Sequence, residues 1–185
     1  MRLHNALRQG NGSSRVSRFD DEADGAKALF HVGAFVGRIA GQQHGMVVLD
    51  EAGQVIRPAL LWNDNRSSGT ATQLNNEFSD IHNLTGSKLV ASFTASKVRW
   101  LRDNEPENAK KVRAIALPHD WLSWKLTGST DINEIFTDRS DASGTGYFDP
   151  STSHYREDIV RLALRHDQEL RLPTVIEPAK FGGTT

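Results

Sequence analysis

The fold of this 185-residue chain is decided by the stretch GQQHGMVVLDEAGQVI at residues 41–56. A polar pentapeptide bounded by glycines leads into the apolar run MVVL, and a glycine-containing turn then leads into the short apolar pair VI. Branched apolar residues on both sides of such a turn predict a β-hairpin. A second apolar run, at residues 32–39, comes just before, so the pentapeptide at residues 41–45 is expected to connect two buried strands.

Downstream of this stretch, helical and strand-like patterns alternate, which predicts the α/β class. Helices are expected at residues 67–78, 95–102, 105–107, 120–127 and 156–166, and a buried strand at residues 112–117. Thr94 is expected to be the N-cap of the second helix, because a threonine oxygen accepts a first-turn N–H. Trp100, Trp121 and Trp124 are expected in the core.

The composition excludes several classes of protein. Lys and Arg number 22 against 23 Asp and Glu, so there is no basic excess that would favour binding to nucleic acid or to an anionic membrane. Cysteine is absent, which excludes disulfides, thiolate metal sites and a cysteine nucleophile. No signal-type or bilayer-length apolar segment is present, and a cytoplasmic location is therefore expected.

The pentapeptide is the most suggestive candidate site. Gln43 and His44 each combine donor and acceptor capacity, which suits the hydroxyl groups of a sugar. Glycines on either side allow the backbone to approach a ligand closely. The alternative is a polar connection whose amides satisfy neighbouring backbone groups.

Two other polar stretches allow both a structural and a binding role. Asn63 and Asp64 follow an apolar run and fit either a turn and helix cap or a ligand surface with Trp62 as its apolar wall. Residues 137–145 are rich in small hydrogen-bonding side chains. They fit a tight buried turn network and also a set of ligand contacts.

Common catalytic signatures are absent from the sequence. There is no phosphate-binding loop of either common type and no Gly-x-Ser-x-Gly motif. None of the seven histidines has the spacing of a zinc ligand pair, so no metal ligand is predicted. His119 and Asp120 fit an acid–base pair, but Asp120 also fits a helix start, where the dipole favours a carboxylate.

Taken together, the segments resemble the amino-terminal domain of the FGGY carbohydrate kinases. They are GQQHG at residues 41–45, RPALLWND at 57–64, FTASK at 93–97, LPHDWL at 117–122 and TDRSDASGT at 137–145. The Gln-x-His-Gly loop resembles the xylulokinase branch, whereas glycerol kinases carry an Arg-Glu pair there. The resemblance covers residues 30–185 and leaves residues 1–29 as a poorly matched segment, expected to be loosely ordered.

The resemblance implies a ribonuclease H-like, actin-type fold and an incomplete amino-terminal domain. It also implies ATP- and Mg²⁺-dependent phosphorylation of D-xylulose to D-xylulose 5-phosphate. On this basis Gln43 and His44 are expected to bind the sugar. The pair Asn63 and Asp64 and the loop of Ser92 and Phe93 are expected to line the same cleft.

The sequence departs from the family pattern in three places. The Gly-x-Asp-x-Gly-Thr strand–turn, the aspartate general base and the second domain have no counterpart in it. No catalytic residue is therefore assigned, and the chain is expected to be inactive alone, with exposed sheet edges that favour self-association. The alternatives are a non-catalytic sugar-binding module, the relic of a broken kinase gene, or a fragment of another FGGY sugar kinase.

Overall fold

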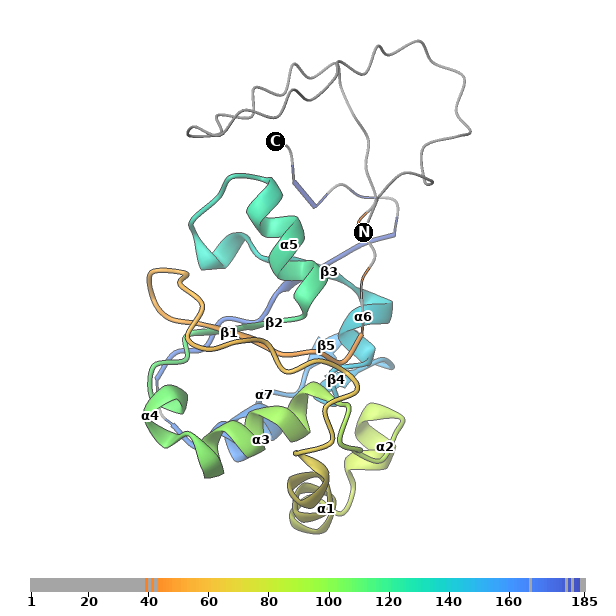
Figure 1. The fold of residues 1–185 in the computed structure, drawn as a ribbon. Helices are drawn as coiled ribbons and strands as arrows, with labels where there is room; N and C mark the ends of the chain where they lie inside the picture. The colour runs from red at the N-terminus through yellow and green to blue at the C-terminus, as the bar shows by residue number, and fades with distance from the viewer. Residues whose placement is uncertain are drawn as a thin grey trace. The chain divides into compact units, whose positions relative to one another are not determined.

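The computed structural model describes residues 39, 41, 43–166, 168–178, 180, 182 and 183. The segment at residues 1–29 and nearly all of the apolar run at residues 32–39 lie outside them. The helices are α1 (Ser68–Glu77), α2 (Ile81–Thr85), α3 (Thr94–Asn104), α4 (Pro106–Ala109), α5 (Pro118–Leu126), α6 (Arg139–Ser143), α7 (Glu157–Leu164) and the 3-10 helix η1 (Ile132–Glu134) (Figure 1). The strands are β1 (Val47–Leu49), β2 (Ala114–Ala116), β3 (Phe136–Asp138), β4 (Phe148–Asp149), β5 (His154–Tyr155) and β6 (Thr174–Ile176).

This mixture of helices and strands confirms the predicted α/β class. In the described part of the chain, no helix combines the length and the apolar character that crossing a membrane requires.

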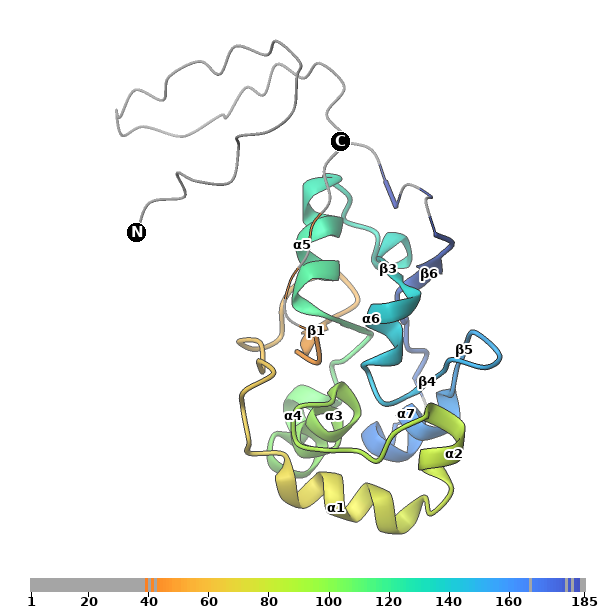
Figure 2. The same ribbon diagram turned by 90° about the vertical axis from the view of Figure 1, so that its right-hand side faces the viewer.

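Strands β1 and β2 form an antiparallel pair between two layers of helices (Figures 1 and 2). Val48 stands opposite Ile115, and Val47 stands opposite Ala116. Because side chains alternate between the faces of a strand, the first pair packs in one apolar cluster and the second pair in another. Helices α3 and α7 cover one face and α5 covers the other, which explains why the run MVVL is apolar without interruption.

Helix α3 carries the centre of the larger cluster. Its Val98 and Leu101 are buried, and they share that cluster with Leu74 of α1 and Ile159 of α7. Full burial of one such side chain stabilises the fold by roughly 1.5–3 kcal/mol. The packing of α3 therefore fixes the loop that precedes it, which becomes important at the candidate site.

Most sequence predictions of local structure are confirmed. The five predicted helices correspond to α1, α3, α4, α5 and α7, and the strand predicted at residues 112–117 contains β2. Of the three tryptophans expected in the core, Trp124 is fully buried. Trp100 and Trp121 are only partly buried and pack at the edges of the two clusters.

The predicted hairpin is only partly formed. Leu49 and Val55 make a single antiparallel bridge, and the N–H of Ile56 donates to the carbonyl of Val48 at 3.0 Å. Along its length, however, β1 pairs with β2, which is more than 60 residues away. The apolar pattern located the strand correctly, whereas its main partner lies far along the chain.

The N-cap prediction for Thr94 is wrong. Phe93 occupies the N-cap of α3, and Thr94 is the first helical residue. The Thr94 hydroxyl donates instead to the carbonyl of Gly45, at 3.2 Å. Its physical role is thus to tie α3 to the polar pentapeptide rather than to close the helix end.

Strands β3 and β6 form a parallel pair, and α6 follows β3 directly. Asp138 is the N-cap of α6, because its side chain accepts from the N–H of Asp141 at 2.8 Å. The hydroxyl of Thr145 donates to the carbonyl of Ala142 at 2.7 Å. The tight turn network expected at residues 137–145 is therefore confirmed, and it holds α6 beside the start of α5 (Figure 2).

Candidate functional site

Residues 43–45 of the polar pentapeptide form a turn that leads into β1. Within it Gln43 is exposed and His44 is partly buried. His44 has a φ of 67°, in the left-handed region that residues other than glycine rarely adopt. A Cβ atom at Gly45 would lie 2.5 Å from Cγ of Pro118, so a glycine is needed for the turn to pack on the start of α5.

Two contacts fix the imidazole ring of His44. Its Nδ1 lies 2.5 Å from the carbonyl oxygen of Gly144, and its ring stacks on Phe93 with centroids 4.8 Å apart. A carbonyl oxygen can only accept, so Nδ1 must carry the proton. In the neutral ring Nε2 is then an acceptor, available to a hydroxyl group of a ligand.

The carboxylate of Asp141 joins Gln43 to a buried histidine. Nε2 of Gln43 donates to Oδ1 of Asp141 at 3.0 Å, and Nε2 of His119 lies 2.7 Å from Oδ2. Because a carboxylate only accepts, His119 must donate through Nε2. A residue of the turn, one of α6 and one of α5 are thereby linked in one network.

A second carboxylate lies on the inner side of His119. Oδ1 of Asp120 is 3.6 Å from His119 Nε2, and its Oδ2 accepts from the N–H of Leu117 at 3.2 Å. Burial raises the pKa of Asp120 to about 7, although the neighbouring imidazole opposes the rise.

The pKa values of the other two groups in the network, His119 and Asp141, shift in opposite directions. Burial alone would lower the pKa of His119, but the hydrogen bond to Asp141 and the two nearby carboxylates outweigh it and raise that pKa. The hydrogen bond from His119 lowers the pKa of Asp141, with a further contribution from Gln43. The hydrogen bond between His119 and Asp141 thus moves their two pKa values apart.

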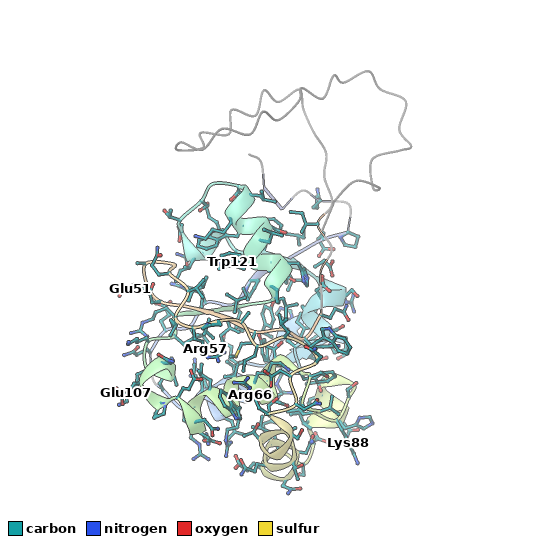
Figure 3. All side chains as sticks on the ribbon, in the orientation of Figure 1. Glu51, Arg57, Arg66, Lys88, Glu107 and Trp121 are labelled. Carbon is teal, nitrogen blue, oxygen red and sulfur yellow. The ribbon has the colours of Figure 1, made fainter. Side chains whose placement is uncertain are left out.

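The turn of Asn63 and Asp64 lies before α1. Oδ1 of Asp64 accepts from the N–H of Arg66 at 3.1 Å and from its Nε at 2.8 Å. Burial opposes ionisation of this carboxyl, but the bonds and charge of Arg66 leave its pKa below the usual value. Arg66 and Arg57, both labelled in Figure 3, also lie over the ring of Trp100, at 4.9 and 5.9 Å from its centroid. Asn63 is exposed, and the pair supports the turn rather than a helix cap.

Ser92 belongs to a loop held by a buried lysine of α3. Nζ of Lys97 donates to the carbonyl oxygens of Ala91 and Ser92, at 2.7 and 2.6 Å. Burial lowers the pKa of Lys97 to about 8, against the attraction of the Asp64 carboxylate. The lysine therefore holds the loop of Ser92 by hydrogen bonds, and only its charge acts on the turn that contains Asp64.

The structure thus groups the sequence-predicted residues in two sets. Gln43 and His44 form one, and Phe93, stacked on His44, connects it to the adjacent Ser92. Asp64 forms the other with Lys97 and Arg66. Within the described residues, no hydrogen bond or ring contact joins Asn63 or Asp64 to Gln43 or His44.

Phe93 was expected to line the cleft together with Ser92, and the structure stacks it on His44. Sequence reasoning did not connect Gly144, His119 or Asp141 with the pentapeptide, although His119 was a candidate acid–base residue and the other two lie in the segment 137–145. Nothing local related either segment to the pentapeptide, since Gln43 and Asp141 are 98 positions apart.

Comparison with known proteins gives a consistent result. Residues 34–185 match the model of the FGGY family of carbohydrate kinases, N-terminal domain. The chain is 47% identical over 150 residues to a xylulose kinase of Streptomyces coelicolor and 45% identical over 150 residues to one of Streptomyces rubiginosus. Each match covers 79% of this chain but 30% of the relative, so the chain spans about 30% of the length of these curated proteins.

The fold agrees with solved structures as well. The crystal structure of xylulose kinase from Bifidobacterium adolescentis superposes with a TM-score of 0.71 at 40% sequence identity. The match covers 77% of this chain and 36% of that one. The α/β fold predicted from the sequence is therefore that of the amino-terminal domain of these kinases.

Proposed function

Because this chain belongs to the FGGY family of carbohydrate kinases, we propose that it binds the sugar in an ATP-dependent phosphorylation of D-xylulose to D-xylulose 5-phosphate. Support comes from relatives named xylulose kinase at 45–47% identity. The family's use of ATP supports a cytoplasmic setting. Gln43 and His44 are the residues proposed to contact the sugar.

One observation carries this proposal: the way in which His44 is held. The carbonyl of Gly144 fixes the proton on Nδ1, and the ring of Phe93 fixes the plane of the imidazole. Nε2 is thereby oriented as an acceptor before any ligand arrives, which reduces the entropy that binding must overcome. A sugar hydroxyl is a donor of the right kind for such an acceptor.

The cofactors of the family do not fit the described residues. No group of three or more histidine, aspartate or glutamate side chains there gathers closely enough to hold a metal ion. The sequence also contains no glycine-rich phosphate-binding loop. Asp141 is not proposed as a substitute base, because its carboxylate is already engaged by Gln43 and His119. We therefore propose that this chain binds sugar without turning it over by itself.

Binding is tested by titrating D-xylulose into the 185-residue chain in a calorimeter. We expect measurable affinity that falls at least tenfold in His44→Ala. The matched control is His154→Ala, since His154 is an exposed histidine whose Nδ1 also lies close to a carbonyl, that of Thr152, at 2.6 Å. Equal losses in both variants, or no binding to the unaltered chain, would overturn the proposal.

Turnover is tested by ADP release with magnesium-ATP, with D-xylulose, D-ribulose or glycerol as acceptor. We expect no sugar-dependent ADP release, while D-xylulose still binds. Sugar-dependent release would contradict the proposed inactivity of the chain alone. Absence of both binding and turnover would favour the relic of a broken gene, and preferred binding of D-ribulose or glycerol would favour another FGGY sugar kinase.

A further inference from the structure

Asp141 occupies a shared position between an exposed and a buried side chain. Its Oδ1 accepts from Gln43 at the surface, and its Oδ2 accepts from His119, which is 6% exposed. The backbone N–H of Asp141 is held in turn by the side chain of Asp138. The carboxylate is therefore fixed at both oxygens and at its backbone.

This arrangement sets the orientation of the Gln43 amide. An ionised carboxylate accepts hydrogen bonds and cannot donate them, so Gln43 must turn its NH₂ group toward Asp141. The carbonyl oxygen Oε1 then points away from that bond. Within the described part of the chain, Oε1 has no hydrogen-bond partner.

The neighbouring side chain, His44, also presents a hydrogen-bond acceptor. In neutral His44, Nδ1 donates to Gly144 and Nε2 is left as an acceptor. Gln43 and His44 thus offer two acceptors, Oε1 and Nε2, on consecutive residues of one turn. Two such acceptors suit a ligand with hydroxyl donors on neighbouring carbon atoms, a pattern found in polyhydroxylated sugars.

His119 limits the freedom of Asp141 itself. Its side chain is packed closely against the loop, because a Cβ atom at Gly41 would lie 2.6 Å from Cβ of His119 and 3.1 Å from the ring atoms Cγ and Nδ1. Its Nε2 donates to Asp141, and Oδ1 of Asp120 lies 3.6 Å from the same nitrogen. A buried donor in a fixed place keeps the Asp141 carboxylate from rotating away from Gln43.

We propose that Asp141 and His119 are positioning residues that hold Gln43 as a hydrogen-bond acceptor, so that the loop selects ligands carrying adjacent hydroxyl groups. This inference rests on the proposed function, since it takes Gln43 and His44 as the sugar contacts. Neither Asp141 nor His119 needs to touch the ligand.

A double-mutant cycle on D-xylulose affinity tests the inference. Asp141→Asn gives residue 141 a donor, which lets the Gln43 amide turn over, and we expect a loss of about tenfold, near the value of one hydrogen bond to a charged group. In the Gln43→Ala background the same change is expected to cost less than twofold. Additive losses would overturn the inference, because Asp141 would then act independently of Gln43. Glu107→Gln, which alters an exposed carboxylate paired only with Lys110, serves as the control.

Variants of His119 separate positioning from mere stability. His119→Gln keeps an N–H donor for Asp141, whereas His119→Leu removes it. We expect the leucine variant to lose affinity about as Asp141→Asn does and the glutamine variant to recover most of it. Equal affinities in the two variants, at equal thermal stability, would overturn the role of His119.

A readout without sugar keeps this test separate from that of the proposed function. The side-chain NH₂ signals of Gln43 in a ¹H–¹⁵N spectrum are expected to shift in Asp141→Asn and in His119→Leu, but not in Glu107→Gln. If these signals shift while D-xylulose fails to bind, the positioning of Gln43 by Asp141 and His119 is supported and the proposed sugar binding is contradicted. If D-xylulose binds while the signals do not respond, the proposed function stands and positioning falls.

Discussion

The imidazole of His44 lies flat against the ring of Phe93, with their planes 27° apart and their centroids 4.8 Å apart. Phe93 is also the N-cap residue of α3, whose apolar side forms the centre of the larger cluster. The position of the proposed sugar-binding ring is thus set by the core, through the helix whose Thr94 also bonds the carbonyl of Gly45.

Replacement of Phe93 by leucine tests this link. Leucine keeps apolar volume but loses the flat face against which the His44 ring rests, and stacked pairs contribute about 0.5–1.5 kcal/mol beyond their buried area. We expect a several-fold loss of D-xylulose affinity with a small fall in melting temperature. Unchanged affinity in Phe93→Leu would show that the carbonyl of Gly144 orients His44 without help.

Replacement of Gly144 by alanine should disturb His44 selectively. The backbone of Gly144 has φ of −78°, which alanine adopts freely, but a Cβ atom would lie 2.8 Å from Cε1 of His44 and 2.9 Å from Nδ1. We expect weaker sugar binding and a shifted His44 ring signal in the NMR spectrum. Gly69→Ala in α1 is the matched control, because nothing lies within 4 Å of its added Cβ and alanine favours a helix. If both variants bind equally well, the contact between Gly144 and His44 is not needed.

The buried amine of Lys97 should make stability depend on pH. Its pKa is about 8 in the folded protein because of burial, against about 10.4 in an unfolded chain. Unfolding therefore takes up a proton between pH 8 and pH 10.4, and the free energy of unfolding contributed by Lys97 rises across that window.

Denaturant titrations of Lys97→Met check this expectation. At pH 10 the neutral amine still bonds two carbonyl oxygens, so the variant is expected to be less stable by about 1–3 kcal/mol. The difference in the free energy of unfolding between Lys97→Met and the unaltered protein should narrow toward pH 7. Lys110→Met, which removes an exposed amine, is the control, and a difference that does not change with pH would contradict the prediction.

Asp120 should contribute a pH dependence of the opposite sign. Burial raises its pKa to about 7 in the folded protein, whereas the unfolded value is near 3.9. The folded state holds a proton that the unfolded state has lost, so stability falls as the pH rises from about 4 to 7. The raised pKa of His119 acts in the same direction, since its contribution is lost as the pH rises through the folded-state value.

Thermal melts of Asp120→Asn from pH 5 to pH 8 test this sign. The amide cannot ionise, so the variant is expected to gain stability relative to the unaltered protein as the pH rises. Asp149→Asn is the control, because hydrogen bonds from Ser151 hold the pKa of Asp149 at about 2, below the measured range. If Asp120→Asn instead loses stability relative to the unaltered protein as the pH rises, the assignment of a protonated buried carboxyl is contradicted.

The local structure could largely be predicted from the sequence, because periodicity and turn residues act over short distances. The run MVVL predicted β1 for that reason, yet it could not reveal that the strand pairs along its length with β2, and that Leu49 alone bridges to Val55 across the turn. Thr94 shows the same limit on a smaller scale. Its hydroxyl found the carbonyl of Gly45, a partner 49 positions away, instead of its own helix.

The candidate site was predictable in part. Gln43 and His44 stood out through their residue types and flanking glycines, and their role in binding sugar stays a prediction. Asp141 and His119 could not be related to them, since the network forms only when α5 and α6 are brought together by packing. The expected self-association through sheet edges also stays a prediction.

The left-handed backbone conformation of His44 is strained, and this strain lies within the candidate site. A histidine there costs of order 1 kcal/mol that a glycine would not. Glycine would relieve that strain, but it would also remove the ring that stacks on Phe93 and bonds the carbonyl of Gly144, two contacts of similar magnitude. The imidazole therefore compensates within its own residue for the backbone conformation that it occupies.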